Sequence, residues 1–167
     1  SSGGVMNGTT SPDITLYFET LPANQLELAL FLEADRMRSL EISQENLDNQ
    51  RQAVQEERRL RIDNRPYGRS NERLSELVFD TFGYKHSPIG TMEDLNAASV
   101  EDIAQFFKTY YAPNNAVLSL VGDFEPKEAM RLIRKYFEPI PRQPDPPAVN
   151  LIEPPQTQER RETIKDQ

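Results

Sequence analysis

Apolar residues alternate with polar ones near the start of the chain. From Ile14 to Phe18 every second side chain is apolar, which predicts a half-buried strand over Ile14–Leu21. Residues 5–10 form a second candidate strand, because the turn-forming residues Ser11-Pro12-Asp13 separate the two stretches. The chain is therefore expected to open with a hairpin.

Further along, apolar residues recur at helical spacing and predict five helices. These helices begin at Asn24, Ser43, Asn71, Ser99 and Pro126, and the second, third and fifth end near Asp63, Phe82 and Phe137. Three of the starts carry a specific signal. Asn24 and Ser99 are each followed three residues later by an acidic residue, Glu27 and Asp102, as in a capping box, and Pro126 suits the first turn of a helix. Between the helices we expect a loop over Gly83–Gly90 and a short apolar strand over Ala116–Val121.

The predicted helices outnumber the predicted strands. This leaves two interpretations, a helix-rich α+β domain or a domain whose sheet takes further strands from outside this chain, and we favour the second. After Pro139 the composition changes, since seven of the 13 prolines lie in the last stretch of the chain. We therefore expect a folded α+β region over residues 1–138, with a glutamate-bearing helix within 43–63 and a helix-strand-helix segment over 99–138. An extended linker over 139–167 follows it.

The amino-acid composition excludes several classes of site and partner. The chain has 167 residues and no cysteine, which excludes disulfides, cysteine-bound zinc and a thiol nucleophile. Its 19 Lys and Arg against 27 Asp and Glu give a formal charge of −8, the wrong sign for binding a nucleic-acid backbone. No apolar run approaches the length of about 20 residues that a membrane span needs, and the first residues lack the pattern of a signal peptide.

One carboxylate stands out on the second predicted helix. At about 100° per residue, Glu57 lies in the middle of an apolar stripe, while Glu56 lies about a quarter turn away. The other residues of this stripe are Leu47, Ala53, Val54 and Leu60. A carboxylate that faces a core is costly unless it pairs with a nearby arginine, accepts hydrogen bonds or binds a metal whose other ligands lie elsewhere. The arginines within reach are Arg51, Arg58, Arg59 and Arg61.

His86 is the one histidine of the chain and lies in the predicted loop. A lone loop histidine is usually solvated or hydrogen-bonded, and this is the favoured interpretation. Metal ligation by His86 is the weaker alternative, because catalytic zinc sites commonly use more than one imidazole.

Ordered segments of the chain resemble the pitrilysin/insulinase zinc peptidases, which include the mitochondrial processing peptidase. The matching segments are Asn7–Glu19, Leu32–Met37, Arg51–Arg59, Asp63–Gly68, Pro88–Leu95, Phe107–Ala116 and Val121–Phe124. They follow the family order up to about Pro141. The resemblance implies an α+β fold of two layers, helices on an antiparallel sheet, that is incomplete here at its N-terminal side and continues through the linker toward a second domain.

The resemblance also implies a zinc-dependent endopeptidase that hydrolyses peptides or small proteins. In the family, two histidines of a His-x-x-Glu-His helix and a downstream glutamate bind one zinc ion, and the glutamate between the histidines activates water. The downstream ligand matches Glu57, the residue that the helix wheel selects, and a further family glutamate matches Gln50. The chain contains no His-x-x-Glu-His, so we expect the catalytic residues and the remaining zinc ligands outside it, and this chain alone to be inactive.

The family also suggests where a substrate binds. Asn7, Gly8 and Thr9 match the edge strand to which a peptide adds as a further strand, and the alternative is a turn before an interior strand. The implied partners are a peptide or small-protein substrate and a second homologous domain or subunit, in a periplasmic or secreted location. The alternative function is a non-catalytic family member that serves as a structural or regulatory partner subunit.

Overall fold

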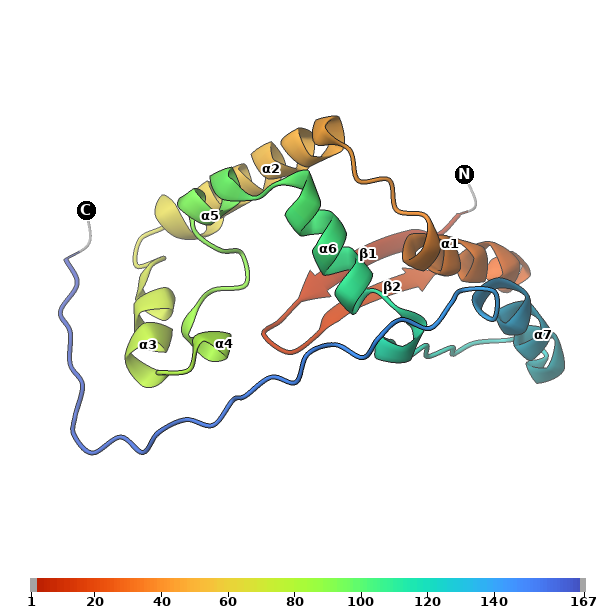
Figure 1. Ribbon diagram of the computed structural model, residues 1–167. Helices are drawn as coiled ribbons and strands as arrows, with labels where there is room; N and C mark the ends of the chain where they lie inside the picture. The colour runs from red at the N-terminus through yellow and green to blue at the C-terminus, as the bar shows by residue number, and fades with distance from the viewer. Residues whose placement is uncertain (1–2, 166–167) are drawn as a thin grey trace. The chain divides into compact units, whose positions relative to one another are not determined.

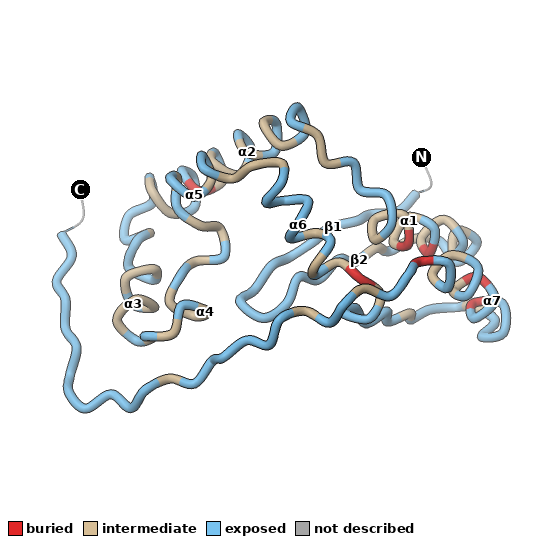
Figure 2. The backbone as a smooth tube through the Cα atoms, viewed as in Figure 1, coloured by how far each residue is buried: buried red, intermediate tan, exposed pale blue. Residues whose placement is uncertain are grey.

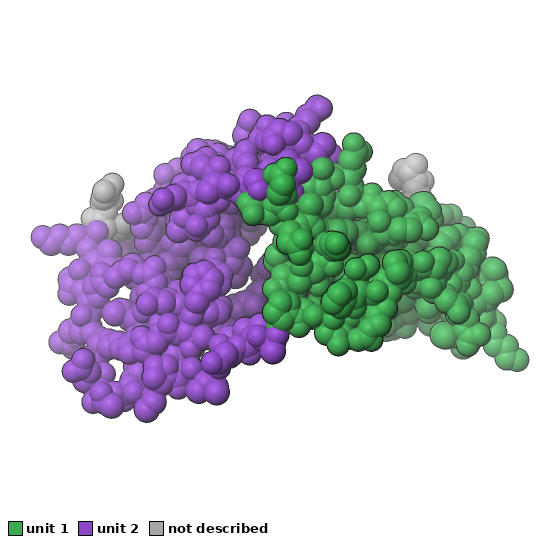
Figure 3. Space-filling view, in the orientation of Figure 1, with its two compact units in different colours: residues 1–9, 15–42, 101–147 green, residues 10–14, 43–100, 148–167 purple. Residues whose placement is uncertain are grey.

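The computed structural model describes residues 3–165, which divide into two compact units (Figure 3). Unit 1 takes in residues 3–9, 15–42 and 101–147 of the described chain, and unit 2 takes in residues 10–14, 43–100 and 148–165. The structure combines helices with one two-stranded sheet, which is the α+β class that the sequence predicts. Within residues 3–165, no helix is both long enough and apolar enough to cross a membrane.

The predicted hairpin is present. β1 (Val5–Thr10) pairs with β2 (Thr15–Thr20) in a two-stranded antiparallel sheet (Figure 1). The prediction that the apolar face of β2 is half-buried is wrong for this chain, since Leu16 and Phe18 are 51% and 45% exposed. A hairpin of two strands offers too little surface to enclose the side chains on either of its faces.

Unit 1 holds the apolar core. Its helices are α1 (Leu26–Arg38), α6 (Val100–Tyr110, with Val100 assigned to unit 2) and α7 (Pro126–Phe137). The buried apolar residues of the described chain all belong to this unit and are marked red in Figure 2: Leu30, Ala34, Ala112, Ala129, Leu132 and Ile140. Burying such side chains contributes roughly 1.5–3 kcal/mol for each large one, so this cluster is the main apolar source of stability.

Contacts between α1 and α7 close this core. The rings of Phe31 and Tyr136 meet edge-on with their centroids 5.8 Å apart. Beside them, the Nζ of Lys135 and the hydroxyl of Tyr136 both donate to Oε1 of Glu27, at 2.6 and 2.7 Å. The two helices are thus joined by an aromatic contact and by a charged one.

Residues 116–121 do not form the predicted strand. They are irregular backbone between a 3-10 turn (η3, Pro113–Asn115) and α7, and Val117 and Val121 are 97% and 92% exposed. A strand exists only through hydrogen bonds to a neighbouring strand, and the sheet of the described chain contains only β1 and β2. The apolar composition alone therefore did not decide the structure of this segment.

Unit 2 is built on α2 (Gln44–Arg58), which continues as a π-helical turn over Arg59–Asp63. Ser43 caps its start, as predicted, by accepting a hydrogen bond from the amide of Asn46 at 3.2 Å. The shorter helices α3 (Ser70–Val78), α4 (Phe82–Lys85) and α5 (Met92–Ala97) follow.

Several predicted boundaries differ from the structure. The first helix begins at Leu26 after a 3-10 turn (η1, Ala23–Gln25), so Asn24 does not cap it. The third helix ends at Val78, and the predicted loop after it contains most of α4. α5 was not predicted, although Thr91 and Asp94 form a full capping box at its start.

Residues 141–165 form neither helix nor strand, but part of the stretch is attached to the helices of unit 2. Just before α4, the carboxylate of Glu153 accepts hydrogen bonds from the amides of Asp80 and Thr81, both at 2.9 Å. At the end of α3, Arg160 donates to the carbonyl of Leu77 at 2.9 Å. These contacts satisfy backbone groups that helix ends leave without partners.

Candidate metal centre

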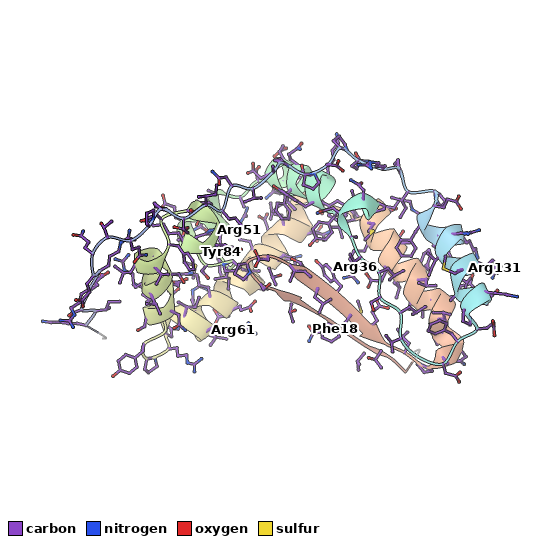
Figure 4. All side chains as sticks on the ribbon, turned by 90° about the horizontal axis from the view of Figure 1, so that it is seen from below. Phe18, Arg36, Arg51, Arg61, Tyr84 and Arg131 are labelled. Atoms are coloured by element: carbon purple, nitrogen blue, oxygen red, sulfur yellow. The ribbon has the colours of Figure 1, made fainter. Side chains whose placement is uncertain are left out.

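Glu57 lies in the last turn of α2, just before the π-helical turn. Its side chain is 42% exposed, and its Oε1 lies 2.6 Å from Nη1 of Arg61, which is itself 74% exposed. Of the arginines considered from the sequence, Arg61 is thus the one that pairs with Glu57 (Arg61 is marked in Figure 4). Glu56 pairs instead with Arg59 at 3.1 Å and is 58% exposed, so Glu57 is the more enclosed member of the pair.

The apolar stripe around Glu57 is largely accessible in unit 2. Ala53 is exposed, Leu60 is 65% exposed, and Leu47 and Val54 are half-buried. Most of this stripe is therefore not covered by other residues that the structure describes. Its accessibility leaves Glu57 at the centre of a partly apolar surface.

A polar face of α2 makes the packing contacts instead. Arg51, marked in Figure 4, donates from Nε to the carbonyl of Leu95 at 2.8 Å and from Nη2 to the carbonyl of Ala98. Gln55 donates to the side chain of Asn96 at 2.8 Å. The carbonyls near the end of α5 lack partners within that helix, and the guanidinium group of an arginine supplies donors for them.

Arg58 completes this polar face and is buried, with its side chain 8% exposed. Its two terminal nitrogens donate to the two carboxylate oxygens of Glu72 on α3, at 2.8 and 3.0 Å. The hydrogen bond with Glu72 raises the pKa of Arg58 above its ordinary value, so the guanidinium group stays charged. The sequence analysis named Arg58 only as a possible partner of Glu57. The spacing of Arg51 and Arg58, two helical turns apart, was the signal that could have revealed their shared face.

His86 contacts Phe82, four residues earlier in the chain. Its Nδ1 donates to the carbonyl of Phe82 at 2.7 Å, and its ring stacks on the ring of Phe82 with the centroids 4.3 Å apart. This agrees with the favoured interpretation of a hydrogen-bonded loop histidine. Among residues 3–165, no three side chains of His, Cys, Asp or Glu come together as a metal site would require.

Glu57 and Gln50 can therefore be compared with a zinc ligand only one residue at a time. Glu57 offers a partly accessible carboxylate held by one exposed arginine, and carboxylate oxygen is a ligand type that zinc accepts. Gln50 lies on the same side of α2, two turns earlier, and is exposed. Glu57 thus fits the part of one zinc ligand, and the described residues supply no complete site.

The predicted substrate residues lie on β1 in unit 1, and all three are exposed. Asn7 turns its side-chain oxygen toward the strand and accepts a hydrogen bond from the amide of Gly8 at 2.8 Å. A Cβ atom at Gly8 would lie 3.2 Å from the ring of Tyr17, so the glycine lets that ring lie close over the strand. In the described sheet, β1 pairs with β2 alone, and its other edge carries no strand.

Comparison with known proteins decides the family. The family described as peptidase M16 inactive domain matches residues 97–167. The zinc protease PqqE of Helicobacter pylori is 38% identical over 138 residues, which cover 83% of this chain and 31% of that protein. The chain belongs to the M16 peptidases, the pitrilysin/insulinase family. The resemblance that the sequence predicts is thereby confirmed.

M16 structures also share the fold. The crystal structure of a protease from Helicobacter pylori matches this chain with a TM-score of 0.86 and 35% identity, over 92% of this chain and 37% of that one. The ferredoxin protease FusC, in complex with Arabidopsis ferredoxin, matches with a TM-score of 0.80 and 25% identity, over 89% and 17%. The chain spans about a third or less of the length of the curated relatives it matches.

Proposed function

We propose that this chain is part of a zinc-dependent endopeptidase that hydrolyses peptides or small proteins. The observation that carries the proposal is the place of Glu57, a carboxylate at the centre of an accessible, partly apolar stripe at the end of α2. The name of the Helicobacter relative, a zinc protease, supports it.

In this proposal Glu57 supplies one ligand of a single zinc ion. The other ligands come from a His-x-x-Glu-His helix outside this chain, which packs on the stripe around Glu57. Gln50 contributes hydrogen bonding close to that centre, in place of a second charge. When bound, zinc polarises the scissile carbonyl and lowers the pKa of bound water. This chain alone is inactive, because one carboxylate and His86 do not make the ligand set of a catalytic zinc site.

The substrate is proposed to bind along the free edge of β1. Asn7, Gly8 and Thr9 are exposed there, and an extended peptide adds to such an edge through main-chain hydrogen bonds. The ferredoxin protease FusC, solved in complex with Arabidopsis ferredoxin, is a relative that binds a protein, which supports this substrate class. A second homologous domain or subunit and a periplasmic or secreted location belong to the same proposal.

Two matched variants of the full-length protein test it. Glu57→Gln keeps the shape of the side chain and removes the negative charge, so we expect the rate of peptide cleavage and the zinc content to fall, the rate by more than about 100-fold. Glu56→Gln is the control, since Glu56 is exposed and pairs with Arg59. Rates measured with a quenched peptide, together with metal analysis, decide the case. A damaging Glu56→Gln and a silent Glu57→Gln would refute the assignment.

A non-catalytic partner subunit is the second candidate. The observation in its favour is that the matching family over residues 97–167 is described as an inactive domain. The two functions differ in the full-length protein, because only the enzyme loses peptide cleavage when a chelator removes its metal. A full-length protein without cleavage or bound zinc, but with a stable homologous partner, would favour the subunit.

A further inference from the structure

In unit 2, the side chain of Arg58 contacts three other segments. Arg58 is the only buried residue of this unit in the part of the chain that the structure describes. Besides its two-point pair with Glu72, it donates from Nη1 to the carbonyl of Gly90, and its Nε lies 3.5 Å from the carboxylate of Asp63. A paired guanidinium and carboxylate fix direction as well as distance. One side chain thus ties α2 to α3, to the segment before α5 and to the π-helical turn.

This fastening acts on α2 from a different side than Glu57. On the helix, Arg51, Gln55 and Arg58 lie about 100° to 160° around the axis from Glu57. Arg58 therefore holds the helix that carries Glu57, while Glu57 pairs with Arg61. The two roles, holding and binding, lie on separate residues and can be tested separately.

A π-helical turn lies next to these contacts of Arg58. It begins at Arg59, directly after Arg58, and a π turn is rare and less favourable than an α turn. Rewinding of this turn by one residue would change the rotation of α2 relative to the residues that follow the turn by about 100°. Arg58 contacts Asp63, the last residue of this turn, and Glu72 on α3, so it joins α2 to segments on the other side of the turn and opposes such a rotation.

We propose that Arg58, held by Glu72, is a positioning residue for Glu57. The inference rests on the proposed role of Glu57 as a zinc ligand. Arg58 acts by fixing the rotation of the last turn of α2, so that the Glu57 carboxylate stays aimed at the position of the metal. Loss of this hold weakens zinc binding and changes the coordination geometry, although no ligand has been removed.

The experiment uses the full-length protein and measures zinc affinity by competition with a chromogenic chelator. It also records the visible spectrum after replacement of zinc by cobalt, whose bands report the ligand geometry. We expect Arg58→Met and Glu72→Gln each to weaken zinc binding by about tenfold or more and to alter the cobalt bands. Arg58→Lys keeps the charge without the two-point pair, so its zinc affinity should lie between those of the wild type and Arg58→Met. Arg59→Met, directly after α2, and Glu76→Gln, on α3, are matched controls and should behave as the wild type.

Circular dichroism of each variant separates positioning from folding. If Arg58→Met loses its helical signal, Glu72→Gln decides, and if both lose it the role is merely structural and the proposal fails. Wild-type zinc affinity and unchanged cobalt bands in both folded variants also refute it. Glu57→Gln is run in parallel: if it retains zinc, the proposed function itself fails. If it loses zinc while the Arg58 and Glu72 variants keep it, only the positioning role is wrong.

Discussion

At the scale of single residues, Glu19 is the group most at odds with its surroundings. Its side chain is 7% exposed, and neither carboxylate oxygen has a hydrogen-bond partner in the described chain. Burial raises the pKa of Glu19, and the nearby carboxyl of Glu33 raises it further, while Arg36 at 3.7 Å acts in the opposite direction. The ionised form is therefore the one that the fold of unit 1 tolerates less.

This predicts a stability that depends on pH. Because the pKa of Glu19 is higher in the folded chain than its ordinary value of 4.5, its stabilising contribution is full below that value and is lost as the pH rises through the raised pKa. Glu19→Gln should raise the free energy of unfolding at pH 7 by about 1 kcal/mol, and the gain should shrink toward pH 4. Urea unfolding at pH 4, 5.5 and 7 measures this, and an equal gain at all three would contradict it.

Glu27→Gln serves as the control for that series. Lys135 and Tyr136 lower the pKa of this exposed carboxyl through hydrogen bonds, so its stabilising contribution is present at neutral pH and is lost in acid. Its substitution should therefore change stability with the opposite sign.

At the scale of elements, Gly8 on β1 allows the close approach of Tyr17, which in turn contacts Tyr111. The ring of Tyr17 lies over this glycine, its hydroxyl is 2.7 Å from the hydroxyl of Tyr111, and the guanidinium of Arg36 lies 4.2 Å from its ring centroid. Burial and the hydrogen bond with Tyr17 raise the pKa of Tyr111 to about 12. The hairpin is thereby linked to the segment after α6 within unit 1.

We expect Gly8→Val to push the Tyr17 ring away and to break the contact with Tyr111. The variant should lose about 1–3 kcal/mol of stability, and the pKa of Tyr111 should fall from about 12 toward its ordinary value of 10. Ultraviolet titration of the tyrosines measures the second effect, with Tyr111→Phe used to assign the change. Thr9→Val, at an exposed neighbouring position, should leave the titration unchanged.

The elements also show what a sequence can predict. Ser43 and Pro126 mark helix starts correctly, because capping and the fixed φ of proline act within one turn of chain. The segment Ala116–Val121 was misjudged, because strand pairing depends on residues far away in the sequence. The same limit applies to the site. A helix wheel places Glu57 on the apolar stripe, but the carbonyls that receive Arg51 and the carboxylate that holds Arg58 are known only from the tertiary structure.

At the scale of the whole molecule, apolar side chains remain exposed in both units. Examples are Val117 and Val121 in unit 1, and Leu60 and Phe82 in unit 2, which are 65–97% exposed. Exposed apolar surface and unpaired strand-forming segments promote association.

We therefore expect the isolated 167-residue chain to oligomerise or aggregate in solution. Sedimentation velocity over a concentration series measures this. The double variant Val117→Lys and Val121→Lys should reduce association, because charges on such a segment oppose strand pairing. A wild-type chain that sediments as a single monomer and melts cooperatively would contradict the prediction.

The buried Arg58 gives unit 2 a response to temperature that differs from that of unit 1. The heat capacity of unfolding comes mainly from apolar surface that becomes hydrated, and the buried apolar residues lie in unit 1. Cooling weakens apolar burial, so it acts on unit 1 first. Guanidinium salts weaken apolar burial as well, and we expect their cation, which resembles the side chain of Arg58, also to donate to the same carboxylate and carbonyl oxygens. We therefore expect the contacts of Arg58 that hold the helix of Glu57 to be less sensitive to cold than the apolar core of unit 1, and to weaken in guanidinium salts.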